Sequence, residues 1–120
     1  MTVSRDVLKV GVESDGEFLV ASLVGALDEG SQHQAESMIL PLLATDRKHL
    51  LLEASGLTFV SSAGLRVIIS AVKVLKPRGG SVSVCAPQPT VEQLLRIAGL
   101  TALIRIHPSV DAARSALNAG

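Results

Sequence analysis

Residues 57–66 read LTFVSSAGLR, and this stretch decides the fold because it lies between two different hydrophobic patterns. Before it, Leu50-Leu51-Leu52 is a short continuous apolar run in a segment ending near Ala54, typical of a strand covered on both faces of a parallel sheet. After it, apolar residues recur at helical spacing from Leu65 to Leu75. The sequence therefore predicts a strand, a loop at residues 55–58, and a helix that begins near two adjacent serines.

The rest of the chain continues this alternation in both directions. Strands are expected at residues 7–12, 18–24, 50–54, 82–84 and 103–106; helices are expected at 31–45, at 65–75, between Thr90 and Gly99, and after Ser109. The order β-β-α-β-α-β-α-β-α predicts an α/β domain with a four- to five-stranded, mostly parallel sheet, an antiparallel edge strand and about four helices. We expect one domain over residues 1–120, with its motifs within about residues 18–117.

Local signals predict where the elements begin and end. Asp15-Gly16 predicts a hairpin, and the preceding Glu13-Ser14 suggests a loop longer than two residues. Pro41 predicts a kink or an early end of the first helix. Three helix starts are expected at a Ser31/Gln34 capping box, at a Thr90/Gln93 capping box and at Ser109 as an N-cap. Gly99 is the expected stop of the helix that begins near Thr90.

Composition excludes several classes of function. Eleven Lys and Arg balance eleven Asp and Glu, and 2% of the residues are aromatic, so neither phosphate neutralisation nor base stacking supports nucleic-acid binding. The single Cys85 lies in an apolar run and is expected to be buried in a strand of a protein from a reducing compartment. The N-terminus lacks the apolar region of a signal peptide and no window approaches a membrane span, so we expect a soluble cytoplasmic protein without a membrane partner.

No motif indicates a cofactor, a metal or a small-molecule substrate. His33, His49 and His107 are scattered and lack metal-ligand spacing, and surface or capping roles are expected for them. The chain has no phosphate-binding loop and no dinucleotide-binding glycine motif. An enzyme with Ser62 as nucleophile would need glycine at position 60, where Val60 stands. We therefore predict that the protein is not an enzyme.

Ser61 and Ser62 are the candidate functional residues. Ligands in parallel α/β sheets bind at the carboxyl ends of strands, which directs attention to residues 25–30 and 55–63. A helix start offers unpaired backbone N–H groups and favours negative charge, including a phosphate on serine. The alternative reading is that one of the two serines simply caps the helix.

Several motifs resemble those of the STAS domain of bacterial anti-sigma factor antagonists, the anti-anti-sigma factors. Residues 25–28 read GALD and resemble a Gly-x-Leu/Ile-Asp motif, and residues 52–60 read LEASGLTFV and resemble Leu-Asp-Leu-Ser-Gly-Val-x-Phe-Ile/Met. Residues 61–65 read SSAGL and fall on Asp-Ser-Ser/Ala-Gly-Leu. Arg78-Gly79-Gly80 and the LLRIAGL of residues 94–100 also match the family's spacing.

This resemblance implies a regulatory phosphoprotein that binds an anti-sigma factor with serine kinase activity and thereby controls transcription by partner switching. The phosphorylated serine falls on Ser62, with Ser61 as the runner-up, and a serine phosphatase would reset the cycle. The implied partner-binding residues are Asp28, Ser61, Ser62, Ala63, Gly64, Leu65 and Arg66.

The sequence differs from the family's motifs at two positions, and the role of a third residue, Asp28, has two readings. Ser61 replaces the family's acidic residue before the serine, and Glu53 replaces an aspartate. Asp28 is in place, as a residue lining the Ser62 site or as a turn residue after Gly25. The other functional readings are a STAS module in a sensory scaffold or lipid-transport complex, which binds a partner unrelated to sigma factors, and a structural oligomer subunit.

Overall fold

Five strands form a single sheet in the order in which they occur along the chain, β1-β2-β3-β4-β5. The structure is a computed structural model that describes residues 7–44 and 46–119. The strands are β1 (Lys9–Asp15), β2 (Phe18–Leu27), β3 (His49–Val60), β4 (Ser81–Cys85) and β5 (Arg105–His107). β1 pairs with β2 in antiparallel fashion and the other pairs are parallel, which confirms the predicted mostly parallel sheet with an antiparallel edge strand.

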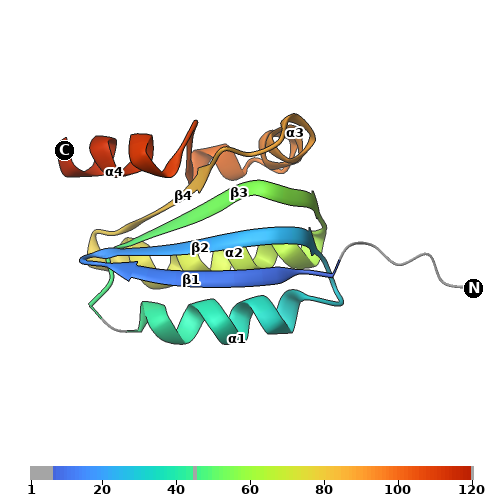
Figure 1. The fold of residues 1–120 in the computed structure, drawn as a ribbon, viewed down its shortest axis with the longest axis horizontal. Helices are drawn as coiled ribbons and strands as arrows, with labels where there is room; N and C mark the ends of the chain where they lie inside the picture. Colours follow the sequence, from blue (N-terminus) through green and yellow to red (C-terminus); the bar gives the residue numbers. More distant parts are fainter. Residues whose placement is uncertain (1–6, 45, 120) are drawn as a thin grey trace, which may run out of the picture.

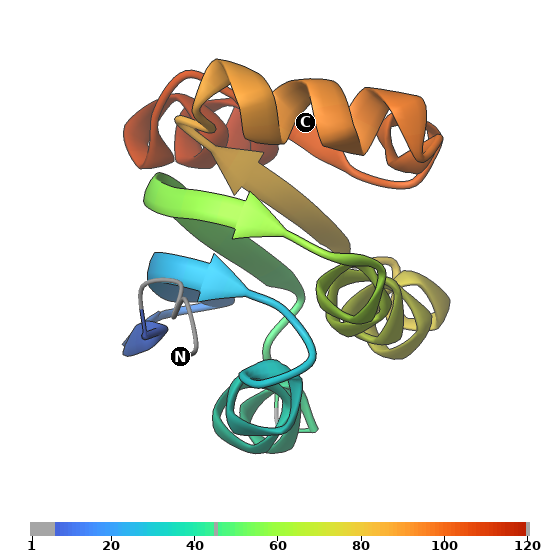
Figure 2. The same cartoon turned by 90° about the vertical axis from the view of Figure 1, so that its right-hand side faces the viewer.

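Helices cover both faces of the sheet. The helices are α1 (Gln32–Leu43), α2 (Ser62–Leu75), α3 (Pro89–Ile97) and α4 (Val110–Ala119), with short 3-10 turns at Lys76–Arg78 and Leu100–Ala102. α1 and α2 lie side by side on one face (Figures 1 and 2), and the buried Val91 and Leu95 of α3 belong to the same main cluster. α4 packs on the opposite face, where Ala113 lies in a second cluster. The element order and the four helices in the described ranges confirm the predicted α/β fold.

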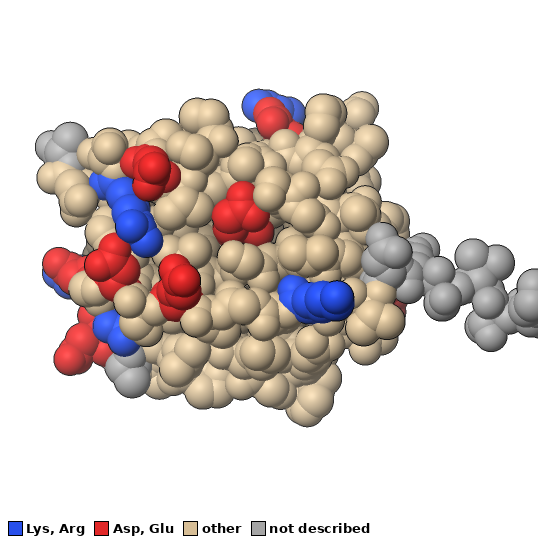
Figure 3. Space-filling view, in the orientation of Figure 1, with Lys and Arg blue, Asp and Glu red and all other residues tan. Residues whose placement is uncertain are grey.

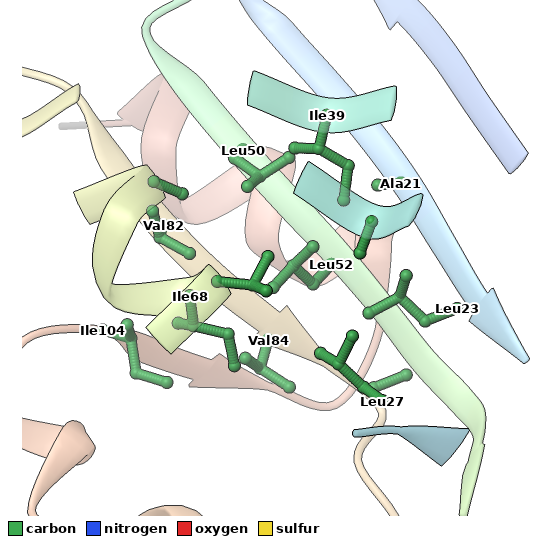
Figure 4. Close-up of a cluster of buried hydrophobic side chains, with 14 of the residues drawn as sticks. Ala21, Leu23, Leu27, Ile39, Leu50, Leu52, Ile68, Val82, Val84 and Ile104 are labelled. Atoms are coloured by element: carbon green, nitrogen blue, oxygen red, sulfur yellow. The ribbon is translucent and has the colours of Figure 1, made fainter. Parts of the chain in front are cut away.

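Strand alternation divides the core between the two faces. Leu50 and Leu52 point toward α1 and α2, where they meet Ile39 and Ile68 in the main cluster (Figure 4). Leu51 points the other way and packs with Ala113 of α4. The run Leu50-Leu51-Leu52 is therefore covered on both faces, as its continuous hydrophobicity predicts.

Cys85 lies in the second cluster, with Phe18, Val20 and Leu51. It is fully buried in β4, which confirms the structural role predicted from its apolar neighbours. Burial, reinforced by the nearby charge of Glu53, raises the pKa of the Cys85 thiol to about 11. The thiol is therefore protonated and shielded at neutral pH.

β3 is longer than predicted. The expected loop at residues 55–58 is part of the strand, which continues to Val60. Its register with β2 shifts twice, first between the pairs Ser22–Glu53 and Val24–Gly56, then between Gly25–Leu57 and Ala26–Phe59. Each shift places one extra residue in β3, as in a β-bulge, so the turn-like residues were accommodated without ending the strand.

The details of the first two connections also differ from expectation. The hairpin loop has two residues, Gly16 and Glu17, because Asp15 pairs directly with Phe18 and Gly16 adopts a positive φ of 61°. Ser31 does not form the predicted capping box. Its hydroxyl donates to the carbonyl of Ala26 (2.8 Å).

The later helix ends show which capping signals were correct. α3 begins at Pro89 rather than at a Thr90 cap, because proline suits the first helical position, where no N–H is needed. Ser109 caps α4 as predicted and accepts a hydrogen bond from the Ala112 N–H (3.0 Å). Pro41 lies in the last turn of α1, which ends at Leu43.

The second helix and the last strand are displaced from their predicted limits. α2 begins at Ser62, three residues before the first apolar residue used to predict it. Leu103 and Ile104 precede β5, because a 3-10 turn follows Gly99, whose φ is 77°. In the described ranges, no helix has the length and apolar character needed to cross a bilayer.

Candidate functional site

Ser62 lies at the carboxyl end of the sheet, where β3 passes into α2. It is the first residue of α2, and its side chain is exposed. Within the described part of the chain, its hydroxyl makes no hydrogen bond or ion pair. The prediction that Ser62 lies at the start of the second helix is confirmed, and the hydroxyl is accessible to another protein.

Ser61, not Ser62, caps the helix. The Ser61 hydroxyl accepts a hydrogen bond from the backbone N–H of Gly64 (3.3 Å), and its carbonyl accepts one from Leu65 (2.9 Å). Ser61 has the extended backbone conformation typical of an N-cap. The two serines therefore have separate positions: one completes the helix, and the other presents a hydroxyl that the helix does not use.

Gly64 holds the first turn of α2 against the end of β2. A Cβ atom at this position would lie 2.5 Å from the backbone oxygen of Leu27, closer than such atoms approach in proteins. The Ser61 N–H donates to the same Leu27 oxygen (2.9 Å). This close contact fixes the position of Ser62 relative to the end of β2.

Asp28 organises the turn that follows β2. Its carboxylate oxygen Oδ1 accepts from the Gly30 N–H (3.0 Å) and from the Ser31 hydroxyl (3.3 Å). These bonds give Asp28 the turn role that was one of its two sequence readings. Because Leu27 pairs with Val60, this turn and the start of α2 lie at neighbouring strand ends, and a role of Asp28 in partner binding stays a prediction.

The other predicted binding residues differ in accessibility. Arg66 is exposed one helical turn beyond Ser62, and Leu65 is half-buried. Ala63 and Gly64 are buried, so any contribution they make to binding acts through the position of their neighbours. The accessible part of the predicted surface is therefore Ser62 and Arg66, bordered by half-buried Asp28, Ser61 and Leu65.

The bulged end of β3 presents polar groups that the sequence analysis did not assign. Thr58 is exposed, and its hydroxyl donates to the carbonyl of Gly25 (3.0 Å). Ser55 is held by the carboxylate of Glu53 (2.9 Å) and, through its carbonyl, by the side-chain amide of Gln88 (2.9 Å). The sequence signal for these residues resembled a loop, which concealed their place on the strand.

Metal-ligating residues do not gather in the described part of the chain. No group of three His, Cys, Asp or Glu side chains there is arranged to hold a metal ion. His33 is exposed, whereas the Nδ1 atom of His49 lies 2.8 Å from the Ser81 hydroxyl. Burial lowers the pKa of His49, and the charge of Glu17 partly opposes this.

The class of protein is therefore an α/β domain whose sheet strands follow their order in the chain and whose second helix begins with an exposed serine. The STAS domain family matches residues 9–113, and the chain belongs to this family. It is 30% identical over 105 residues to the anti-sigma F factor antagonist of Paenibacillus polymyxa, covering 83% of this chain and 86% of that protein.

Solved structures share the fold. An anti-sigma factor antagonist from Mycobacterium paratuberculosis gives a TM-score of 0.84 at 24% identity, covering 94% of this chain and 96% of that one. The unphosphorylated form of the anti-sigma factor antagonist SpoIIAA gives a TM-score of 0.82 at 19% identity, covering 93% of this chain and 98% of that one. The phosphorylated form of the Bacillus protein SpoIIAA gives a TM-score of 0.72 at 19% identity, covering 91% of this chain and 99% of that one.

Gly64→Ala should destabilise the protein. Contact with the Leu27 backbone should cost about 3 kcal/mol, and the better helix propensity of alanine should offset about 1 kcal/mol of it, leaving a loss of about 2 kcal/mol. Urea unfolding measures this loss. Gly11→Ala is the control, because a Cβ there meets no atom within 4 Å, and it should change stability by less than about 1 kcal/mol. If Gly64→Ala were as stable as Gly11→Ala, the close contact at Gly64 would be contradicted.

Ser61→Ala and Ser62→Ala should differ in stability. Loss of the Ser61 cap should reduce the free energy of unfolding by about 1 kcal/mol. Loss of the exposed Ser62 hydroxyl should change it by less than about 0.5 kcal/mol. Urea unfolding of the two variants side by side measures the difference. A larger loss for Ser62→Ala would show that the cap had been assigned to the wrong serine.

Proposed function

We propose that this protein is an anti-sigma factor antagonist that binds an anti-sigma factor with serine kinase activity through the surface around Ser62. Phosphorylation of Ser62 releases the partner, and a serine phosphatase restores binding. The observation that carries this proposal is the exposed Ser62 hydroxyl beside a helix cap supplied by Ser61. Membership of the STAS family and the name of the 30% identical relative support it.

The position of Ser62 suits a switch that changes binding more than folding. A phosphate at the helix start lies near unpaired backbone N–H groups, and Arg66 is exposed four residues along the same helix. The domain can therefore carry the added charge of nearly two units. At an interface the same charge must be desolvated or brought near partner carboxylates, which weakens the complex.

The proposal assigns the protein a binding role and no catalytic residue. A nucleophilic serine needs a neighbouring base, and in the described residues no histidine is hydrogen-bonded to Ser62. Acidic and basic side chains are interspersed on the face seen in Figure 3, so this face lacks a basic stripe for nucleic acid. The effect on transcription, in a cytoplasmic setting, would pass through the protein partner.

The kinase reaction tests the proposed site. Incubation with ATP and the cognate anti-sigma factor should add one phosphate to Ser62. Trypsin cleavage after Lys48 and Arg66 gives one peptide that contains both serines, and fragment ions distinguish them.

Two variants serve as controls for this reaction. Ser62→Ala should accept no phosphate, whereas Ser61→Ala should still be phosphorylated. Phosphate on neither serine, with a kinase shown to be active on another substrate, would refute the regulatory site. A partner unrelated to sigma factors, captured by the same surface, would favour the sensory scaffold or lipid-transport reading instead.

A further inference from the structure

Among the described residues, β1 has a strand partner on one side only, which is β2. It forms an edge of the sheet, with α1 beneath it (Figure 1). Its seven residues pair with β2 in continuous register from Lys9–Val24 to Asp15–Phe18, without a bulge or a proline. Bulges, prolines, very short strands and charged side chains, above all lysine, are the usual devices that protect an edge from further pairing. Of these devices, β1 has only the charged side chains. The opposite edge, β5, has three residues and is protected by its shortness.

The hairpin determines which backbone groups face the unpaired side. The two residues that close a two-residue hairpin loop, Asp15 and Phe18, exchange backbone hydrogen bonds, and such pairs alternate along an antiparallel ladder. The N–H and C=O groups of Lys9, Gly11 and Glu13 therefore face β2. Those of Val10 and Val12 face outward, where a further strand can bind them.

We propose that β1 pairs with β1 of a second copy of this chain, antiparallel and centred on Gly11, to form a symmetric dimer with a continuous ten-stranded sheet. In this register Val10 and Val12 exchange their outward backbone hydrogen bonds with Val12 and Val10 of the second copy. The two Gly11 residues face each other at the two-fold axis, and a Cβ there would meet no atom of its own chain within 4 Å. A two-fold axis requires such a self-complementary surface.

The side chains of β1 are self-complementary in the same register. Lys9 lies opposite Glu13 of the second copy, and Glu13 lies opposite Lys9, which gives two pairs of opposite charge on one face of the sheet. Both side chains are exposed, and neither forms an ion pair within the described residues. On the other face, half-buried Val10 and Val12 meet each other across the axis and gain apolar contact.

A shift of the register loses this match. Moving the pairing by two residues keeps each side chain on its face and places Lys9 opposite Asp15 and Glu13 opposite Gly11. Asp15 already forms an ion pair with Arg114 (3.0 Å). The register centred on Gly11 is therefore favoured, because it places the charges of Lys9 and Glu13 opposite each other.

α1 places apolar side chains beside the same edge. Gln34 in the first turn of α1 donates to the carbonyl of Leu8, directly before β1 (3.1 Å), so this side of the helix faces β1. Met38 and Leu42 follow at intervals of four on the same side, with 37% and 38% of their surfaces exposed. In the proposed dimer the two α1 helices lie under the joined strands, and these side chains extend the contact.

Sedimentation equilibrium of the full chain tests the proposal. Because one strand pair and a few side chains form a small interface, we expect weak association between about 10 µM and 1 mM protein. Lys9→Glu and Glu13→Lys each place like charges in both cross-strand pairs, and each should weaken self-association about tenfold or more. The double variant Lys9→Glu/Glu13→Lys restores opposite charges and should associate like the parent.

Mixing the two single variants gives the matched control. Lys9→Glu carries two acidic residues on this face and Glu13→Lys carries two basic ones, so an equimolar mixture should form a heterodimer although neither variant pairs with itself. In the parent, the amide N–H groups of Val10 and Val12 should become protected from hydrogen exchange as the concentration rises. A parent that stays monomeric at 1 mM, or association that is unchanged in both single variants, would overturn the proposal.

Discussion

The contact between the first turn of α2 and the end of β2 is the constraint on which the proposed site depends. Because Gly64 lacks a side chain, the helix approaches the Leu27 carbonyl, and the Ser61 N–H binds the same oxygen. Helix α2 therefore starts at the end of the sheet with little freedom to shift. Ser61 satisfies a backbone donor inside this contact, and Ser62 remains outside it with an accessible hydroxyl. The position of Ser62 is therefore fixed, and its exposed hydroxyl is available for the phosphorylation that we propose.

The same arrangement separates stability from recognition. Ala63 and Gly64 are buried, whereas Ser62, directly before them, and Arg66, two residues after Gly64, are exposed. A phosphate added to Ser62 would change the charge of the surface without entering the core. The unpaired edge of β1 is separated from β3 by β2, so self-association through that edge and partner binding at Ser62 use different surfaces. A dimer would carry two copies of the Ser62 surface.

The sequence predicted the architecture well because hydrophobic period and element order constrain it strongly. Leu50-Leu51-Leu52 indicated a strand covered on both faces, and the alternation of strands and helices indicated the mostly parallel sheet. The local ends were less predictable, because tertiary contacts decided them. Ser31 bonds back to Ala26 instead of capping α1, and β3 continues through Ser55–Gly56 because a bulge tolerates residues that usually mark a loop. At the candidate site the sequence located both serines, but the Ser61–Gly64 hydrogen bond was needed to assign the cap.

Titration calorimetry of Ser62→Asp against the purified anti-sigma factor tests the central claim most directly. A permanent negative charge at Ser62 should weaken binding about tenfold or more, a loss of ~1.4 kcal/mol or more, while urea unfolding shows an intact domain. Ser115→Asp adds the same charge to an exposed position of α4, on the other face of the sheet, and should bind like the parent. Binding by Ser62→Asp as tight as that of the parent would contradict the phosphoswitch.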